Sequence, residues 1–179
     1  MRYIHLFLSF FLSVSVCFGI APSARADGNS EMVVKAVMIR KFVEFVTWPE
    51  AVAPQKEMLV KVCVYGDSAM TQMGAVFSKT SGASAIKYSL TSISQLDNVT
   101  GNCHVLFIAA SKQDHLSGVL SKKPVLTVSD SQGFVEKGGM IGFQVIDGKI
   151  RYNINNRAFG ESQMKIDAQL LEIANKVVE

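Results

Sequence analysis

The chain has one candidate nucleophile, at a position where some hydrolases place theirs. Residues 66–68 (Gly-Asp-Ser) follow an apolar run, and a Gly-Asp-Ser turn after a first strand carries the nucleophile of one group of lipases and esterases. That chemistry needs a histidine to accept the serine proton and a carboxylate to orient the histidine. The group supplies both as Asp-x-x-His near the carboxyl terminus, but here no histidine follows His115, and neither His104 nor His115 has an aspartate three positions earlier. We therefore expect Ser68 to cap a helix, and we predict no catalytic residue and no enzymatic activity.

The cysteines are the second set of residues that could do chemistry. Cys17 lies in an N-terminal segment that we expect to be removed, which leaves Cys63 and Cys103. An even number of cysteines in an exported protein predicts a disulfide. Closing a loop of about 40 residues is worth roughly 4 kcal/mol in the chain-entropy model. A zinc site is the weaker alternative, because the chain has no Cys-x-x-Cys pair and few histidines. We predict no metal and no cofactor.

Four further features have both a structural and a functional interpretation. Gly138-Gly139 favours a turn into a strand, with a phosphate-binding loop as the alternative. His104 suits a core or edge position in a strand better than a ligand position. Asp130 follows a strand end, where α/β proteins bind ligands, but a cap or a turn explains it equally well. Trp48 is either a buried side chain or an exposed interaction element.

Composition and charge exclude several classes of protein. The 179 residues allow one domain or two very small ones, and 49% hydrophobic with 18% charged residues is a globular composition. Lys and Arg exceed Asp and Glu by only three, which argues against nucleic acid as the main partner. The chain has no G-x-G-x-x-G and no Walker lysine motif for a nucleotide.

Residues 1–26 have the three parts of a secretory signal peptide. These are Arg2, an apolar stretch at 4–20, and Ala24-Arg25-Ala26. A membrane anchor is the alternative, because about 17 apolar residues are near the lower limit for a span. Cleavage after Ala26 leaves one domain over 27–179, with a net charge of 16 − 15 = +1. We expect this domain to be soluble outside the cytoplasm, with no direct membrane insertion.

The elements that must position these residues alternate between strands and helices. Helical spacing of apolar residues gives way to short β-branched runs and returns after each run. Asp147-Gly148, between two β-rich runs, predicts a hairpin. The predicted helices span 31 to about 47, 69–79, 111–120 and 162–177. The predicted strands span 59–65, 86–90, 103–109, 124–128, 140–146 and 149–155.

This order predicts the fold class. Strands alternating with helices imply right-handed βαβ units and parallel strand pairing. We therefore predict a single Rossmann-like α/β domain with a mostly parallel central sheet, extended by a C-terminal β-hairpin, with helices on both faces. The closing helix over 162–177 would bury one apolar stripe, made of Ile166, Leu170, Ile173 and Val177.

Several segments, taken in order, resemble the YfiR family of periplasmic proteins. No segment is diagnostic alone, but their joint order is specific, and the resemblance runs from about residue 31 to 177. The segments are Phe42–Pro49 (FVEFVTWP), Val62–Gly66 (VCVYG), Cys103–Ile108 (CHVLFI), Val125–Asp130 (VLTVSD), Phe134 with Gly138–Ile141 (GGMI), Ile150–Asn155 (IRYNIN) and Lys165–Leu171 (KIDAQLL).

The resemblance implies a non-enzymatic regulator in the periplasm. Similar proteins bind and repress the periplasmic sensor domain of an inner-membrane diguanylate cyclase, or of a related sensor, and so control cyclic di-GMP and biofilm formation. Cys63 and Cys103 match the disulfide positions of the family. Some relatives have a second disulfide near the glycine-rich stretch, but this chain has no cysteine there.

The surface that would bind the partner is predicted from the closing helix. Met164, Ala168 and Leu171 lie off the centre of its apolar stripe, so we expect them to form part of a partner patch, with Trp48 as a second location. The alternative is that they widen the buried stripe. A second copy of the chain is another candidate partner. The alternative function is a periplasmic small-ligand binding module, with a concave site at the strand ends near Gly66 and Asp130.

Overall fold

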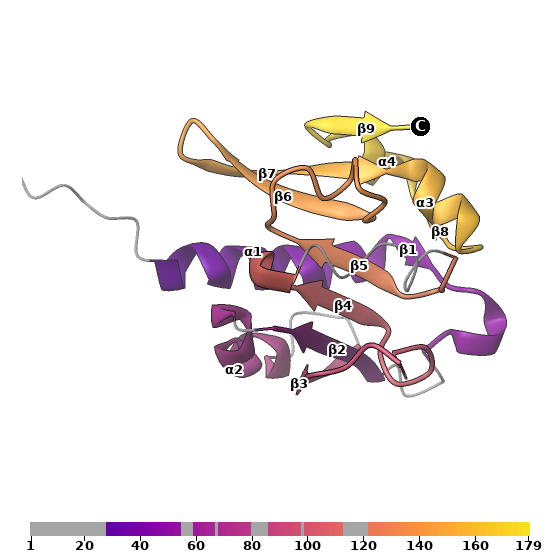
Figure 1. Cartoon of the computed structure of the whole chain (residues 1–179), viewed down its shortest axis with the longest axis horizontal. Coiled ribbons are helices and arrows are strands. Elements are labelled where there is room, and N and C mark those ends of the chain that lie inside the picture. The colour runs from indigo at the N-terminus through magenta and orange to yellow at the C-terminus, as the bar shows by residue number, and fades with distance from the viewer. Residues whose placement is uncertain (1–27, 55–58, 67, 80–85, 98, 113–121) are drawn as a thin grey trace, which may run out of the picture.

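A seven-stranded sheet forms the centre of the protein (Figure 1). The computed structural model describes residues 28–54, 59–66, 68–79, 86–97, 99–112 and 122–179, so the expected signal peptide lies outside the described residues. The strands lie in the order β3-β2-β4-β5-β6-β7-β9. Their bounds are β2 Leu59–Tyr65, β3 Lys87–Ile93, β4 Val105–Ile108, β5 Leu126–Ser129, β6 Ile141–Ile146, β7 Lys149–Asn155 and β9 Lys176–Val178.

Strands β2 to β6 pair in parallel, and the hairpin reverses the direction. β7 is antiparallel to β6, and β9 is parallel to β7. The prediction of an α/β domain with a mostly parallel sheet and an antiparallel hairpin is confirmed. All residues of β4 and β5 are buried, which explains why both strands are continuous apolar or small runs in the sequence.

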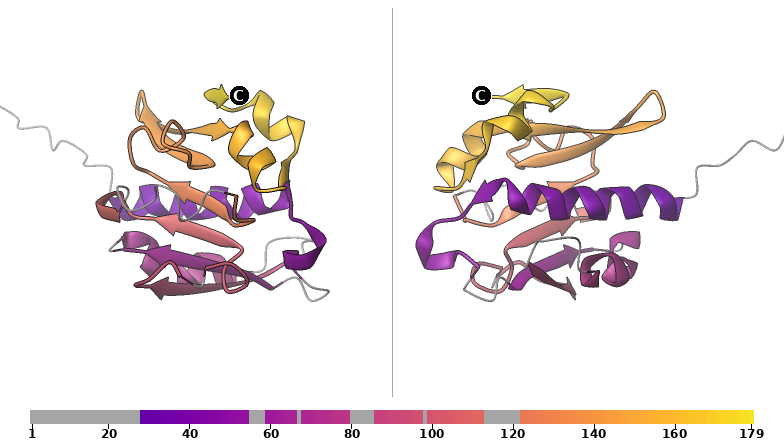
Figure 2. Two further views of the ribbon diagram at one scale, coloured as in Figure 1. Left: turned by 45° about the vertical axis from the view of Figure 1, so that its right-hand side comes forward. Right: turned by 180° about the vertical axis from the view of Figure 1, so that it is seen from behind.

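One face of the sheet is covered by α1 (Gly28–Glu44), with α2 (Gly74–Ser78) beside it (Figure 2). α1 buries Ala36, Ile39 and Phe42 against the strands. The Phe42 ring stacks on Phe143 at 5.7 Å and meets Tyr152 edge-on at 5.0 Å. These aromatic contacts fix the helix across the middle of the sheet.

The opposite face buries a second apolar cluster around the two cysteines. Tyr65, Leu106 and Ile108 project from β2 and β4 into this cluster. The loops that follow β3 and β5 cover it through Leu96 and Phe134. The helix predicted over 111–120 lies almost entirely outside the described residues.

The prediction of one closing helix over 162–177 is wrong. The chain forms α3 (Asn156–Glu161), β8 (Lys165–Ile166), α4 (Ala168–Glu172) and then β9. Gln163, with φ 61°, ends the helical path, and the Asp167 carboxylate caps α4 by accepting from the Gln169 N–H. Val177 pairs with Ile154 of β7. The apolar residues are spaced as on a helix. The Asp167 cap and the pairing of β9 with β7 nevertheless divide the segment into separate elements.

Three shorter elements complete the described structure. β1 (Val46–Thr47) pairs with β8 in a separate two-stranded sheet. The short 3-10 helices η1 (Glu50–Val52) and η2 (Ala69–Gln72) lie on either side of β2 in the chain. The predicted helix over 69–79 is therefore η2 followed by α2.

Candidate functional site

Cys63 and Cys103 form the predicted disulfide. Their Cα atoms lie 5.8 Å apart, and the bond joins β2 to the residues that lead into β4. Both cysteines are almost fully buried on the face of the sheet opposite α1. The disulfide therefore links the loop after β3 to the floor formed by β2.

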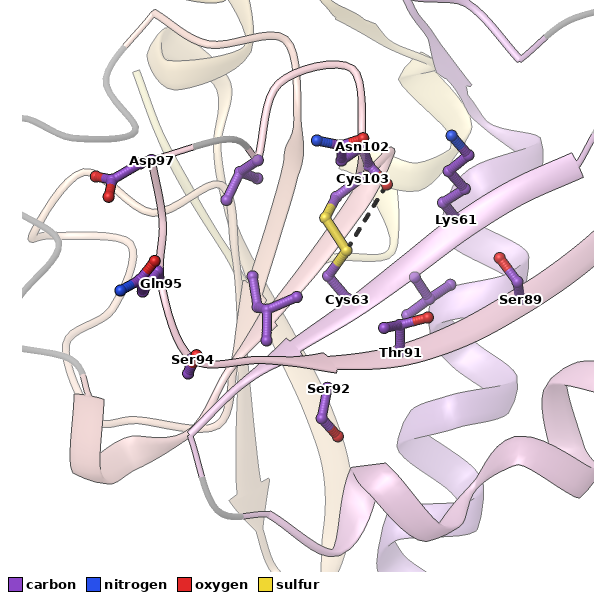
Figure 3. Close-up of a pocket in the computed structure, with 13 residues that line it drawn as sticks. Lys61, Cys63, Ser89, Thr91, Ser92, Ser94, Gln95, Asp97, Asn102 and Cys103 are labelled. Carbon is purple, nitrogen blue, oxygen red and sulfur yellow. Dashed lines mark hydrogen bonds between the residues drawn. A yellow bond between two sulfur atoms is a disulfide. The ribbon is translucent and has the colours of Figure 1, made fainter.

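A groove of about 570 Å³ lies beside this disulfide (Figure 3). Strands β2 and β3 and the loop that follows β3 form it, and most of its side chains carry hydroxyl or amide groups. Its lining residues are Lys61, Val62, Cys63, Ser89, Thr91, Ser92, Ile93, Ser94, Gln95, Asp97, Val99, Asn102 and Cys103. A cavity of this size lies within the usual range for small-molecule sites.

The two charged side chains of the groove have opposite signs. Figure 3 shows Asp97 at one end of the lining residues and Lys61 toward the other, with Asn102 and the disulfide between them. Within the described part of the chain, neither Lys61 nor Asp97 makes an ion pair through its side chain. The groove is therefore neutral overall, but it is dipolar along its length.

A second cluster of charges lies at the carboxyl end of β5. The Lys35 ammonium group, whose side chain is 5% exposed, contacts Glu31 at 2.6 Å and Asp130 at 2.9 Å. Burial lowers the pKa of Lys35, but hydrogen bonds and attraction to the two carboxylates outweigh it, so its pKa is raised above 10.5. Lys35 is therefore charged and paired with both carboxylates. The cavity beside this cluster has a volume of only about 210 Å³.

His104 and Trp48 lie together at the start of β4. The Nδ1 atom of His104 accepts a hydrogen bond from the Lys61 N–H at 2.9 Å. The Trp48 ring meets the imidazole edge-on at 6.4 Å. Trp48 is only 8% exposed, and its Nε1 atom has no hydrogen-bond partner among the described residues. Both side chains therefore pack within the fold.

His104 predicts a loss of stability in mild acid. Burial, together with the nearby Lys61 charge, lowers the pKa of His104 below 6.5. Below the unfolded-state pKa, the unfolded chain therefore binds more protons than the folded one, so the free energy of unfolding falls as pH drops. We expect His104→Gln to flatten the urea-measured stability profile between about pH 7 and 5. An unchanged acid slope in the variant would contradict this assignment.

The candidate nucleophile has a structural role. The Ser68 side chain accepts a hydrogen bond from the Met70 N–H at 3.2 Å and so caps η2, as predicted. Asp67 lies outside the described residues. Across the described ranges, no group of three or more His, Cys, Asp or Glu side chains is placed to hold a metal ion.

The glycine pair also shapes the backbone. Gly138 has φ 95°, a conformation that favours glycine, and a Cβ at Gly139 would collide with the Phe134 ring. The pair thus forms the turn into β6, as predicted.

The residues of the predicted partner patch differ in burial, because the C-terminal segment is not one helix. Met164 is 2% exposed and Trp48 is buried, whereas Ala168 is exposed and Leu171 is half-buried against the core. Ile173, assigned from sequence to a buried stripe, is 70% exposed. Of the predicted ligand-site residues, Asp130 lines the small cavity and Gly66 lines neither cavity.

Sequence reasoning missed Lys61, Asp97 and Lys35. Lys61 lies in an otherwise apolar strand, and a lysine at that place was the available signal. Lys35 stands among the polar residues of a helix, and nothing in its spacing distinguishes it from an exposed lysine. Asp97 follows the strand by four residues, and its position depends on the path of the loop.

Comparisons with known proteins match this chain to a sequence family and to a solved structure of similar fold. The sequence model described as YfiR/HmsC-like matches residues 32–175. No curated protein matches the chain. A similar solved structure is the crystal structure of a conserved domain protein from Vibrio cholerae O1 biovar eltor str. N16961, with a TM-score of 0.51 and 11% identity over 82% of this chain. The match covers 60% of that protein, and at this identity it shows a shared fold alone.

Proposed function

This chain belongs to the YfiR/HmsC-like family, and we propose that it represses a membrane-bound diguanylate cyclase by binding the periplasmic sensor domain of that enzyme. The family match, which spans almost the whole described domain, is the observation that carries the proposal. At the level of the family it supports a periplasmic regulator rather than a catalyst.

Two features of the chain are consistent with that setting. The Cys63–Cys103 disulfide suits an oxidising compartment. Over the residues that the structure describes, no helix combines the length and the apolar character needed to cross a membrane. The proposed repressor would therefore reach a membrane cyclase from the periplasmic side.

We place the partner-binding surface on α4 and the residue that follows it. Ala168, Leu171 and Ile173 form this α4 patch, in which Leu171 packs against the core and Ile173 projects into solvent. Exposed charged residues, Glu172 and Lys176, border it. An apolar anchor with a polar rim is the arrangement that carries most binding energy in protein interfaces. Met164 and Trp48 are buried and are therefore left out of the proposed contact surface.

A charge in the α4 patch is expected to release the cyclase. Ile173→Glu places a carboxylate on an exposed position, so the protein should keep its fold by circular dichroism. Loss of an interface anchor typically costs about 2 kcal/mol, so we expect about thirtyfold weaker binding to the periplasmic domain and a rise in cellular cyclic di-GMP.

Val145→Glu is the matched control for this variant. Val145 is also an exposed large apolar residue, at 56%, but it lies in the β6–β7 hairpin. We expect it to bind and repress as the parent protein does. A folded Ile173→Glu variant with unchanged binding would move the contact surface away from α4.

A further inference from the structure

We infer that the groove beside the disulfide binds a short peptide with free ends, whose carboxylate contacts Lys61 and whose ammonium group contacts Asp97. This role is separate from repression of a cyclase, and it can be tested on the purified protein without a partner. It rests on the shape of the groove, the charges at its ends and the polar groups between them.

The part of the groove that runs along β3 suits three or four residues in extended form. Lys61 pairs in register with Ser89, near the start of β3, while Asp97 lies four residues beyond the end of that strand. Ser89 and Ile93 are four residue steps apart, or about 13 Å at 3.3 Å per residue. An extended chain covers about 3.5 Å per residue, so three or four residues span this distance.

The charges distinguish a free-ended peptide from other polar ligands. An ammonium group and a carboxylate at separate ends, neither of which forms an ion pair with a described residue, favour a ligand with complementary charges the same distance apart. Either charge alone would suit a simple anion or cation. Their presence in one neutral groove favours a dipolar molecule.

The residues between the charges match a peptide backbone. Thr91, Ser94 and Gln95 carry groups that both donate and accept hydrogen bonds, as successive peptide N–H and C=O groups require. Ile93, which is half-buried, supplies apolar surface for a small side chain, whereas Val99 and the two cysteines are almost fully buried and expose little. β3 is the edge strand of the described sheet, so the groove is bordered by an edge that has no neighbouring strand there.

Isothermal titration of the protein purified from the periplasm tests the inference with four probes. These are trialanine, N-acetyl-trialanine, trialanine amide and N-acetyl-trialanine amide. They share the same three residues and differ in whether the amino end, the carboxyl end or both are blocked and therefore uncharged. We expect trialanine to bind best, each blocked end to weaken binding about tenfold, and the doubly blocked peptide to bind weakest.

Variants assign each end of the peptide to its residue. Asp97→Asn should weaken trialanine about tenfold but leave N-acetyl-trialanine unchanged. Lys61→Gln should weaken trialanine equally but leave trialanine amide unchanged. Lys149→Gln is the matched control, because Lys149 is an exposed lysine at the start of β7, and this variant should bind all four probes as the parent does.

Three outcomes would overturn the inference. One is no heat of binding for trialanine at millimolar concentration. Another is equal binding of all four peptides, which would mean that the end charges are not recognised. A third is equal binding of trialanine and N-acetyl-trialanine with loss only in Lys61→Gln, which would identify a simple anion site. The probe comparison uses the unaltered protein, so it decides the matter even if a variant fails to fold.

Discussion

Replacing Cys63 and Cys103 together by alanine is expected to lower the free energy of unfolding by about 4 kcal/mol. The disulfide closes a loop with a sequence separation of 40, and removing it returns the conformational entropy of that loop to the unfolded chain. Both sites are buried, so the variant also loses packing around the sulfur atoms. This loss is a large share of a typical domain stability of about 5–15 kcal/mol.

Urea denaturation of the parent and variant measures this difference. Reduction of the parent protein with dithiothreitol is the matched control, because it breaks the same bond without changing the sequence. The two losses should agree to within about 1 kcal/mol. A loss below about 1 kcal/mol in both would show that the loop after β3 is held mainly by its other contacts.

Lys35→Ala is expected to lower the free energy of unfolding by about 3 kcal/mol. The substitution removes a buried cation and leaves Glu31 and Asp130 facing one another without compensation. Breaking a buried ion pair on one side has this magnitude because the remaining charge stays partly desolvated. The same contacts join the first turns of α1 to the end of β5, so the helix would also lose a tie to the sheet.

Lys41→Ala is the matched control on the same helix. Lys41 pairs with Glu44 at 2.8 Å, but its side chain is exposed, and such pairs contribute about 0.5 kcal/mol or less. Chemical denaturation at neutral pH should therefore separate the two alanine variants by more than 2 kcal/mol. Equal losses for both lysines would mean that burial does not determine the contribution of Lys35.

The central strands β4 and β5 could be predicted from sequence because each is a continuous run of apolar or small residues. A strand that is buried on both faces shows no alternation of apolar and polar residues, as β4 and β5 illustrate. The hairpin could also be predicted from sequence, because an Asp-Gly pair favours the positive φ that Asp147 and Gly148 both adopt in the turn. For these strands and this turn, the neighbouring residues in the sequence were sufficient to predict the structure.

In the C-terminal segment, over 162–177, the neighbouring residues in the sequence were not sufficient to predict the structure. Ile166, Leu170 and Ile173 are spaced as on a helix, but Ile166 belongs to β8 and Ile173 is exposed. The strand β9 exists because Val177 meets Ile154 of β7, a residue 23 positions earlier in the chain. Such long-range pairing is invisible in a window of one helix length, so the partner patch derived from that helix had to be redrawn.

The groove was missed for a related reason. Its charged residues come from β2 and from the loop after β3, which lie far apart in the sequence. The disulfide itself was predictable from the cysteine count, but the cavity beside it depends on the path of the loop. Sequence reasoning placed a concave site at Gly66 and Asp130, where the carboxyl ends of parallel strands normally hold ligands.

We propose that this protein restrains cyclic di-GMP synthesis from the periplasm, and mass spectrometry of cellular cyclic di-GMP, with and without the gene, tests this proposal. Deletion of the gene should raise the cyclic di-GMP level several-fold. The parent protein should reverse this rise, and Ile173→Glu expressed at the same level should not. If the cyclic di-GMP level stays unchanged or falls on deletion, under conditions in which the protein is made, the protein does not repress a cyclase.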